Sequence, residues 1–329
     1  MNILVTGGAG YIGSHTVRAL LSSRRFTPVV FDNLSTGHAE SVPEGTVLVK
    51  GDIHDIDFVA DTLKKYNIEG VIHFAAYSLV GESMVDPAKY YTNNVEGTLH
   101  LLLGMKKAGV DKIVFSSTAA VYGEPEKTPI EEDFPHSPTN VYGRTKLVIE
   151  NMMRDFTNAY GLHYVALRYF NAAGAALDGS IGEDHNPESH LIPLILKTAQ
   201  GVRDHIAIYG TDYPTPDGTC IRDYIHVLDL ADAHVLAMKY LAEGGKSTYF
   251  NLGSEKGFSV REIIETAKKV TGIDFKVTEE ARRSGDPAIL IASSKKCRET
   301  LGWHPTHSTT EEIIASAWKW HKEHPYGYK

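Results

Sequence analysis

Cysteine is scarce in this sequence. The 329 residues contain only Cys220 and Cys297, and neither lies in a C-x-x-C pair or another spacing typical of metal ligands. This scarcity excludes a small disulfide-stapled scaffold and a cysteine-based zinc module. We expect two free thiols in a reducing compartment, with one disulfide between distant segments as the alternative.

Long apolar runs and clusters of basic residues are also absent from the sequence. No apolar run approaches the length of a membrane span, and Met1 leads directly into a strand pattern without a charged leader. The net charge is −8 without a basic tract, which argues against nucleic acid or a membrane as the main partner. With 42% apolar and 22% charged residues, the composition is typical of a soluble globular protein, which we expect to be cytoplasmic.

The first half of the chain alternates short apolar runs with amphipathic segments. Strands are expected at residues 2–6, 28–31, 46–50, 70–74, 112–116, 164–168 and 248–252. Helices are expected at residues 11–21, 56–65, 87–108, 141–160, 191–198 and 229–241, the last with Asp229 as its N-cap. Strands that alternate with helices predict an α/β fold with a doubly wound parallel (Rossmann) sheet.

The amino-acid composition changes after Asn171, because residues 171–190 are rich in Gly, Ala, Asp, Asn and His. A chain of this length also favours more than one lobe. We therefore predict a dinucleotide-binding domain formed by residues 1–170 plus about 225–252. A smaller α/β substrate-binding lobe would comprise about 171–224 plus 253–329.

A glycine-rich segment joins the first strand to the first helix. Gly7, Gly10 and Gly13 stand where a side chain would block the chain reversal, the approach of a pyrophosphate, or helix-on-strand packing. The N-terminus of the following helix offers free N–H groups to phosphates. The motif alone is a weak signal, because many strand-to-helix turns use glycine for structural reasons.

Asp32 strengthens this interpretation. It ends the second strand, 19 positions after Gly13, where a carboxylate can accept hydrogen bonds from both adenosine ribose hydroxyls and would repel a 2′-phosphate. Arg24 and Arg25 precede the strand and are poorly placed to bind such a phosphate. The sequence therefore predicts NAD rather than NADP, with Asp32 as a simple loop cap as the alternative.

Two further strand ends belong to the same edge of the predicted sheet. Asp52 follows the third strand and could bind the adenine amino group, while Ala75 and Ala76 follow the fourth and would let a cofactor lie close to the backbone. The alternatives are a turn residue and ordinary packing.

Tyr142 and Lys146 form the candidate catalytic pair. They lie one helical turn apart on one face, 24 residues beyond Thr118 at the end of the fifth strand. A free tyrosine has a pKa of about 10, and we expect the lysine and an oxidised nicotinamide ring to lower it. Thr118 could bind the reacting oxygen. The alternative is a solvated Tyr–Lys pair.

These motifs, with several others, resemble the extended short-chain dehydrogenase/reductase family, and within it most closely the UDP-glucose 4-epimerases (UDP-galactose 4-epimerases). The segments that carry the resemblance are Thr6–His15, Asp32–Leu34, Gly51–Ile53, Val80–Ser83, Tyr142-x-x-x-Lys146, Leu167–Asn171, Arg222–His226 and Arg283–Asp286. The resemblance implies catalysis by Tyr142, Lys146 and Thr118. It implies transient oxidation of a UDP-hexose at C4 with tightly bound NAD, rotation of the 4-keto sugar, and hydride return to the opposite face.

The glycine motif and the resemblance together assign two sets of binding residues. The cofactor set is Gly7, Gly10, Tyr11, Ile12, Gly13, Asp32, Asn33, Asp52, Ile53, Phe74, Ala75, Ala76, Asn93, Tyr142, Lys146 and Phe170. The substrate set is Thr118, Tyr142, Asn171, His190, Leu191, Tyr209, Arg222, Arg283, Asp286 and Leu290. The two arginines suit a diphosphate, with surface or carboxylate-paired arginine as the alternative.

Three positions differ from some members of the family. Ser78 stands where some carry lysine, Thr118 where others have serine, and Leu290 where some carry tyrosine against the sugar. We expect Leu290 to leave a roomier pocket that admits N-acetylated UDP-sugars. No metal is expected, because no metal-ligand spacing is evident.

Other functions remain open on the sequence. Dehydratases that resemble this family carry an acid pair where Ala119 and Ala120 stand here, so elimination lacks its acid and base. A related nucleotide-sugar epimerase acting on a uronate sugar is another candidate, as is an NAD-binding sensor without chemistry. By fold analogy, helices 87–108 and 141–160 could form a four-helix homodimer contact.

Overall fold

The computed structural model describes residues 1–283 and 286–328. Its main element is a parallel seven-stranded sheet in the order β11-β6-β5-β4-β1-β2-β3. The strands are β1 (Asn2–Thr6), β2 (Thr27–Asp32), β3 (Val47–Lys50), β4 (Ile68–His73), β5 (Lys112–Ser116), β6 (His163–Arg168) and β11 (Thr248–Asn251). The strand order reverses between β1 and β4, so the predicted doubly wound sheet is confirmed and has its switch point there.

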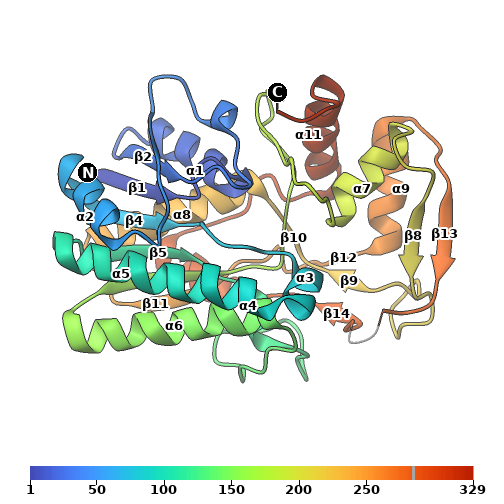
Figure 1. Ribbon diagram of the computed structural model, residues 1–329. Coiled ribbons are helices and arrows are strands. Elements are labelled where there is room, and N and C mark those ends of the chain that lie inside the picture. Colours follow the sequence, from blue (N-terminus) through green and yellow to red (C-terminus); the bar gives the residue numbers. More distant parts are fainter. Residues whose placement is uncertain (284–285, 329) are drawn as a thin grey trace.

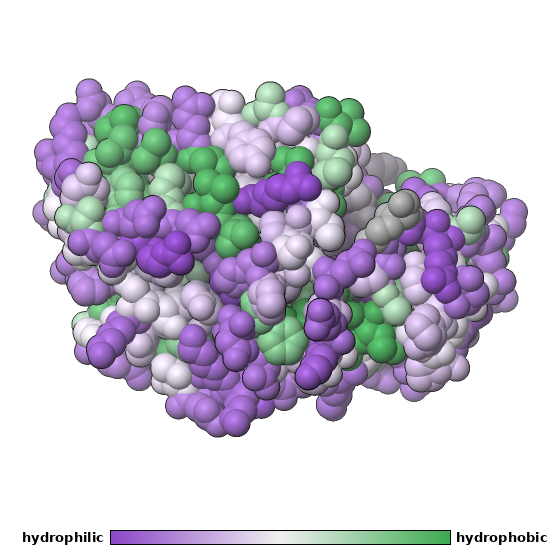
Figure 2. Space-filling view, turned by 90° about the horizontal axis from the view of Figure 1, so that it is seen from below, coloured by the Kyte–Doolittle hydropathy of each residue, from purple (hydrophilic) through white to green (hydrophobic). Residues whose placement is uncertain are grey.

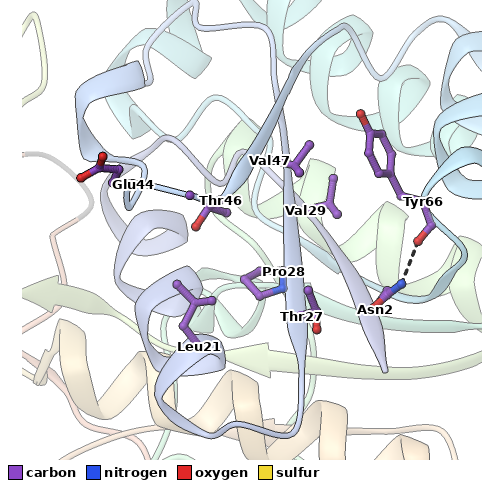
Figure 3. A pocket seen from close by; sticks show the side chains of 10 residues that line it. Asn2, Leu21, Thr27, Pro28, Val29, Glu44, Thr46, Val47 and Tyr66 are labelled. Atoms are coloured by element: carbon purple, nitrogen blue, oxygen red, sulfur yellow. Dashed lines mark hydrogen bonds between the residues drawn. The ribbon is translucent and has the colours of Figure 1, made fainter.

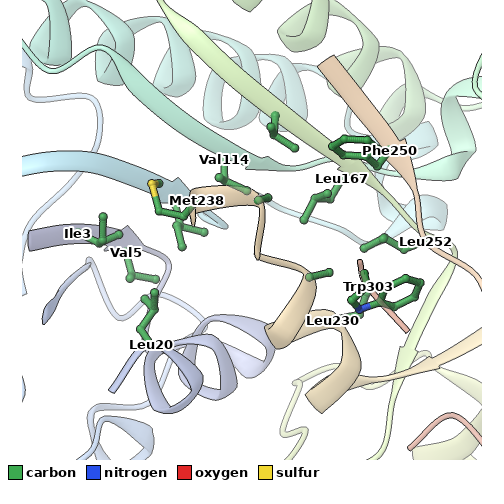
Figure 4. Packing of buried hydrophobic residues seen from close by; sticks show 14 of the residues in the cluster. Ile3, Val5, Leu20, Val114, Leu167, Leu230, Met238, Phe250, Leu252 and Trp303 are labelled. Atoms are coloured by element: carbon green, nitrogen blue, oxygen red, sulfur yellow. The ribbon is translucent and has the colours of Figure 1, made fainter. Parts of the chain in front are cut away.

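Helices cover both faces of this sheet (Figure 1). One face carries α1 (Tyr11–Ser22) and α8 (Val227–Ala242), and the other carries α2 (Ile56–Lys65), α5 (Gly97–Ala108) and α6 (Val141–Tyr160). Successive strand residues point to opposite faces, so Ile3 and Val5 join the α1/α8 core while Leu4 joins the other. Figure 4 shows part of this α1/α8 core, the cluster of buried apolar side chains that pack between the sheet and helices α1 and α8.

The edge of the sheet is completed by α8 and β11, as the sequence predicts. The expected N-cap is wrong, because α8 begins at Val227 and its N-cap is His226, whose Nδ1 accepts the Leu228 N–H at 3.1 Å. The Asp229 carboxylate instead accepts main-chain N–H groups of Thr306 and His307 at 2.8 and 3.0 Å. These partners are distant in sequence, so no local pattern reveals them.

The predicted helix over 87–108 is interrupted by a π-helical turn. It consists of α4 (Pro87–Tyr90), the π-helical residues Tyr91–Glu96 and α5. Asn94 lies fully buried in that turn, and its side chain pairs with the main chain of Tyr77 through hydrogen bonds of 2.9 and 3.0 Å. The turn places the neighbouring Asn93 in the wall of a large cavity; such turns are frequent at functional sites.

The remaining elements include short strands and helices of up to 14 residues. They comprise α3 (Val80–Val85), β7 (Asn171–Ala173), α7 (Leu191–Ala199), β8 (Ile206–Tyr209), β9 (Ile221–Arg222), β10 (Tyr224–His226), β12 (Phe258–Ser259), α9 (Val260–Thr271), β13 (Val277–Glu280), β14 (Ile289–Leu290), α10 (Lys295–Leu301) and α11 (Thr310–Glu323), with 3₁₀ turns at Ala39–Ser41 and Ala119–Tyr122. The short strands pair as β10-β7, β12-β9-β14 and β13-β8. A separate apolar core joins α7, α9 and α11, which Figure 1 shows together beside the large sheet.

The division into two domains stays a prediction. Two residues from the proposed second lobe, Cys297 and Trp303, pack into the α1/α8 core with Leu230 and Phe250. Both cysteines are buried and free, as expected. Within residues 1–283 and 286–328, no helix combines the length and apolar character that a bilayer crossing requires.

Candidate active site

A cavity of about 1040 Å³ opens at the carboxyl ends of the parallel strands, where ligands bind in open α/β sheets. The whole predicted cofactor set lines it. Of the predicted substrate set, Thr118, Tyr142, Asn171, His190, Arg222, Asp286 and Leu290 also line it. Among the described residues of that set, Leu191, Tyr209 and Arg283 are not part of this lining.

The glycine turn after β1 forms one wall of the cavity. Gly7 has φ +70°, and a Cβ there would approach the Ala75 nitrogen to 2.6 Å; a Cβ on Gly13 would collide with the Gly7 carbonyl oxygen. Gly10 is the N-cap of α1, and no side chain caps that helix end. The first N–H groups of α1 therefore face the cavity without a capping side chain, which fits the binding of a diphosphate.

Asp32 is held at the rim of the cavity by two main-chain groups. Its Oδ2 accepts the Ala9 N–H at 2.9 Å and its Oδ1 accepts the Leu34 N–H at 2.8 Å. Burial raises the pKa of this carboxyl despite those bonds. Asp32 thus caps the loop and also faces the cavity, so the two interpretations of this residue are compatible.

Asp52 lies beside it in a hydrogen-bonded cluster. Its Oδ1 lies 2.6 Å from His54 Nδ1, and its Oδ2 accepts from Asn33 Nδ2 at 3.1 Å. Burial opposes ionisation, but the bonds from His54 and Asn33 lower the pKa of Asp52. The cavity therefore has two adjacent carboxylates at the end of the sheet formed by β2 and β3.

Tyr142 lies in the first turn of α6, where Asn140 caps the helix by accepting the Gly143 N–H at 2.7 Å. The Tyr142 N–H donates to Ser83 Oγ at 3.1 Å. Thr118 follows β5, and its Oγ1 accepts the Ala120 N–H at 3.1 Å. The Thr118 hydroxyl is also hydrogen-bonded to the Tyr142 side chain, and this bond lowers the pKa of Tyr142.

Lys146 lies beside Tyr142 but makes its hydrogen bond to the main chain at the end of β5. Its Nζ donates to the Ser116 carbonyl oxygen at 2.8 Å and lies 5.7 Å from the centre of the Tyr142 ring. Burial lowers the pKa of Lys146 to about 7, although Glu150 opposes this. Burial raises the pKa of Tyr142 to about 12, and the hydrogen bond with Thr118 lowers it only in part. In the protein alone, desolvation therefore outweighs the hydrogen bond that favours the phenolate. The expectation that the lysine and an oxidised nicotinamide ring together lower the phenol pKa stays a prediction.

A buried ion pair, which the sequence interpretation did not predict, lies behind Thr118 and Tyr142. Arg168 is fully buried and its guanidinium makes paired bonds with Glu150 through Nε (2.9 Å) and Nη2. Ser117 Oγ donates to Glu150 Oε1 at 2.6 Å, and Arg168 Nη1 donates to the Tyr122 oxygen at 2.7 Å. The pair therefore fixes the strand end that precedes Thr118. An arginine at the end of an apolar strand, as Arg168 is in β6, was the available signal.

The two arginines that were predicted to bind a diphosphate, Arg222 and Arg283, differ in position: Arg222 lines the cavity and Arg283 does not. Arg222 lines the cavity, pairs with Asp286 through Nη2 and donates to its neighbour's carbonyl through Nη1. Arg283 instead stacks over the Tyr209 ring, with its guanidinium carbon 3.9 Å from the ring centre, and neither residue is part of the cavity lining. Ser284 and Gly285, which the resemblance also uses, lie outside the described residues.

His190 belongs to a group of four titratable residues at the edge of the cavity. Its Nδ1 lies 2.8 Å from Glu183 Oε1 and 3.0 Å from Glu188 Oε1, and His185 Nδ1 lies 3.0 Å from Glu183 Oε1. Burial opposes protonation, but Glu183 and Glu188 raise the pKa of His190 to about 10. The sequence interpretation missed the other three residues, although two histidines and two glutamates within eight positions were visible.

A second, smaller depression of about 310 Å³ lies at the amino ends of β1, β2 and β3 (Figure 3). Apolar side chains such as Leu21, Pro28 and Val29 surround it, together with the carboxylate of Glu44. This depression is at the opposite end of the strands from the glycine turn and Tyr142, which both line the large cavity. The large cavity is therefore the candidate active site.

Comparison with known proteins finds chains that are similar to this one over nearly its whole length. A protein from Lacticaseibacillus casei named UDP-glucose 4-epimerase is 54% identical over 328 residues, covering 100% of this chain and 99% of the relative. The solved UDP-glucose 4-epimerase of Brucella ovis, in complex with NAD, is 51% identical with a TM-score of 0.94, covering 96% of this chain and 97% of that one. The UDP-Glc/GlcNAc 4-epimerase of Campylobacter jejuni is 42% identical with a TM-score of 0.87, covering 98% and 99%.

The family model described as NAD dependent epimerase/dehydratase family matches residues 3–253. This match includes the glycine turn, Asp32, Thr118, Tyr142 and Lys146. The chain belongs to the NAD dependent epimerase/dehydratase family.

Proposed function

We propose that this protein is an NAD-dependent isomerase that interconverts UDP-glucose and UDP-galactose by inverting the hydroxyl-bearing carbon C4. The observation that carries the proposal is the gathering of Thr118, Tyr142 and Lys146 in one cavity that also contains the glycine turn. The relatives named UDP-glucose 4-epimerase, which match the chain over its whole length, support the choice of substrate.

The residues of the cavity fit NAD. The glycine turn and the N-terminus of α1 would hold the diphosphate, and the Asp32 carboxylate would accept the adenosine ribose hydroxyls. Asn93, Lys146 and Phe170 would surround the nicotinamide end. When bound, NAD⁺ accepts a hydride from sugar C4 and returns it, so it is not consumed.

Tyr142 is the proposed proton carrier. As phenolate it takes the proton of the C4 hydroxyl while C4 loses a hydride, which leaves a 4-keto sugar. In the return step the phenol gives the proton back to the C4 oxygen, and a hydride added to the opposite face produces the epimer. Thr118 would hold the C4 oxygen in line with the phenol, since both line the same cavity.

The inversion requires that the sugar turn over while the nucleotide stays fixed. Arg222, which lines the cavity, would anchor the diphosphate with paired bonds after giving up part of its contact with Asp286. Asn171 lies near, with its Nδ2 bonded to the Asp223 carbonyl at 3.0 Å. The roles proposed for Leu191, Tyr209 and Arg283 rest on the resemblance alone.

N-acetylated UDP-sugars are proposed as additional substrates. Leu290 lines the cavity and packs against the Ala119 and Ile130 cluster with Phe170, so it occupies little space beside the sugar site. Ser78 also lines the cavity with a small side chain. A relative named UDP-Glc/GlcNAc 4-epimerase, 42% identical, supports this extension. Elimination is not supported, because Ala119 and Ala120 supply neither acid nor base.

We also propose that the protein is a cytoplasmic homodimer. The outer surfaces of α5 and α6 carry partly or fully exposed apolar side chains, among them Leu99, Leu103 and Val148. Figure 2 shows hydrophobic residues gathered on this side of the molecule between polar areas. A four-helix contact between two copies would cover them. The buried free thiols of Cys220 and Cys297 suit a reducing compartment.

The decisive experiment combines ligand identification with an activity assay. The small molecules released on denaturing the purified protein would be identified, and UDP-galactose would then be added to native protein and followed to UDP-glucose. We expect NAD in the released fraction and conversion to an equilibrium mixture. Bound NAD without conversion would instead indicate a nucleotide-sensing protein.

A further inference from the structure

Glu183, His185, Glu188 and His190, here called the His–Glu cluster, form a compact group in the irregular segment between β7 and α7. Their spacing is Glu-x-His-x-x-Glu-x-His. Each can offer one ligand atom, and these atoms all lie within 4.8 Å of one another. The proposed epimerase reaction uses only His190 from this group, so the concentration of ligands needs its own explanation.

The separations between ligand atoms in the His–Glu cluster lie on either side of the value expected around one small ion. Glu183 Oε1 lies 3.0 Å from His185 Nδ1 and 2.8 Å from His190 Nδ1. Glu188 oxygens lie 3.0 Å from His190 Nδ1 and 3.9 Å from His185 Nδ1. Ligands of a tetrahedral zinc ion, with bonds of about 2.0–2.1 Å, are separated by roughly 3.4 Å. Small shifts of the four side chains would therefore enclose an ion.

The charge and burial of the cluster also suit a divalent cation. The two carboxylates are almost wholly buried, with side-chain exposures of 5% for Glu183 and 3% for Glu188. In the metal-bound form, two buried carboxylates with two deprotonated, neutral imidazoles would balance one 2+ ion, and binding would release the protons that the histidines share with Glu183 and Glu188. His185 and His190 are 28% and 38% exposed and line the large cavity, which provides an entry path.

The main chain around these ligands is anchored on several sides. Glu188 Oε1 accepts the N–H groups of Ser189 and His190 at 2.7 and 2.8 Å. The Glu183 carbonyl accepts from Trp320 Nε1 at 3.3 Å. These bonds orient the ligands before any ion arrives, as outer partners do in metal sites.

We propose that the His–Glu cluster binds one divalent transition-metal ion of the zinc type through four protein ligands. Four protein ligands leave no open position, which is typical of a structural rather than a catalytic site. The ion fastens the segment from Glu183 to His190, which otherwise lacks helix and strand, beside Tyr11 at the wall of the large cavity. The site is separate from the proton transfer at Tyr142.

The test measures metal directly. Purified full-length protein would be dialysed against a chelator, incubated with ZnCl₂, freed of excess metal by gel filtration and analysed by mass spectrometry for zinc. We expect one equivalent of zinc and a higher Tm on zinc addition. Co²⁺ in its place should give the visible spectrum of a four-coordinate ion without a thiolate charge-transfer band, which excludes Cys220 and Cys297 as ligands.

His185→Asn and Glu188→Gln should weaken zinc binding at least about 100-fold and abolish the Tm shift. The matched control His205→Asn changes an exposed histidine outside the cluster and should retain the full equivalent. Circular dichroism checks that each variant is folded. A wild-type protein that retains no zinc, or zinc binding that both cluster variants preserve, overturns the proposal whether or not the protein epimerises UDP-sugars.

Discussion

The ammonium nitrogen of Lys146 donates a hydrogen bond of 2.8 Å to the main-chain carbonyl oxygen of Ser116, the last residue of β5. This bond ties α6 to the sheet and holds the ammonium 5.7 Å from the centre of the Tyr142 ring. Only 2% of Lys146 is exposed, so its charge is costly in the absence of ligand. The lysine is thus a buried cation whose protonation should be visible in the stability of the protein.

The first prediction concerns that stability as a function of pH. Burial lowers the pKa of Lys146 from 10.5 to about 7 in the folded protein. Between these values the unfolded chain binds the extra proton, so the free energy of unfolding should rise with pH relative to Lys146→Met, by about 1.4 kcal/mol per pH unit. Urea unfolding of nucleotide-free protein at several pH values between 7 and 10 measures this.

The matched control for this experiment is Lys64→Met, at an exposed position on α2. Its stability should run parallel to that of the wild type at every pH. If Lys146→Met also ran parallel, Lys146 would keep its ordinary pKa in the fold.

The second prediction is that Tyr142→Phe loses activity but keeps its cofactor. Removal of the phenol oxygen removes the proton carrier, and general acid–base groups contribute about 10²–10⁴-fold to a rate. The conversion of UDP-galactose should fall by that factor, while the nucleotide released on denaturation stays constant. Tyr160→Phe, an exposed position on the same helix, is the control and should be fully active. Retained turnover in Tyr142→Phe would assign the proton transfer to another group.

The third prediction follows from the high pKa of Tyr142. Burial raises it to about 12 in the protein alone, so the phenol is almost fully protonated near neutral pH. A positive charge close to the phenol favours the phenolate and lowers its pKa. The tyrosinate absorbance difference between wild type and Tyr142→Phe should therefore appear at lower pH when NAD⁺ is bound than when the protein is free of nucleotide. An unchanged midpoint would contradict the proposed role of the cofactor charge.

The fourth prediction concerns the buried pair behind the active site. Glu150→Gln leaves the Arg168 guanidinium buried without its charge partner, which should cost about 3–5 kcal/mol in the free energy of unfolding. Urea denaturation measures the loss. The control Glu265→Gln replaces an exposed glutamate on α9 and should leave the denaturation midpoint unchanged. A small loss in Glu150→Gln would mean that water reaches the pair.

Much of the sheet could be predicted from the sequence, because the central strands are rich in apolar residues and helices such as α2 and α9 are amphipathic with a period near 3.6. The π-helical turn at Asn93 could not, since it depends on the burial of Asn94 against Tyr77. The two-residue strands β9 and β14 carry too few side chains for any period. These strands are defined by hydrogen bonds to strands that are distant in the sequence, and the local sequence does not predict such pairing.

The candidate site shows the same limit. Spacing identified Tyr142 and Lys146 as neighbours, but it did not show that the lysine bonds to Ser116 or that burial outweighs its charge. Likewise, the resemblance placed Tyr209 and Arg283 with the substrate, but it did not show that the two stack on each other and that neither is part of the cavity lining. The residue types predict which chemistry is available, whereas the orientation of each side chain depends on how it packs in the fold.

The fifth prediction concerns the sugar pocket. Leu290 lines the cavity in β14 and packs near Phe170. In Leu290→Tyr, the larger ring should occupy space that an N-acetyl group needs, while a plain hexose still fits. Because steric exclusion of one group is worth about 1–3 kcal/mol in a pocket, kcat/KM for UDP-GlcNAc should fall about 10–200-fold. The value for UDP-galactose should change much less.

Leu290→Met, which conserves volume, is the control and should keep the wild-type ratio of kcat/KM for the two substrates. An equal loss for both sugars in Leu290→Tyr would show a general disturbance of the cavity, and no UDP-GlcNAc turnover in the wild type would contradict the roomier pocket itself.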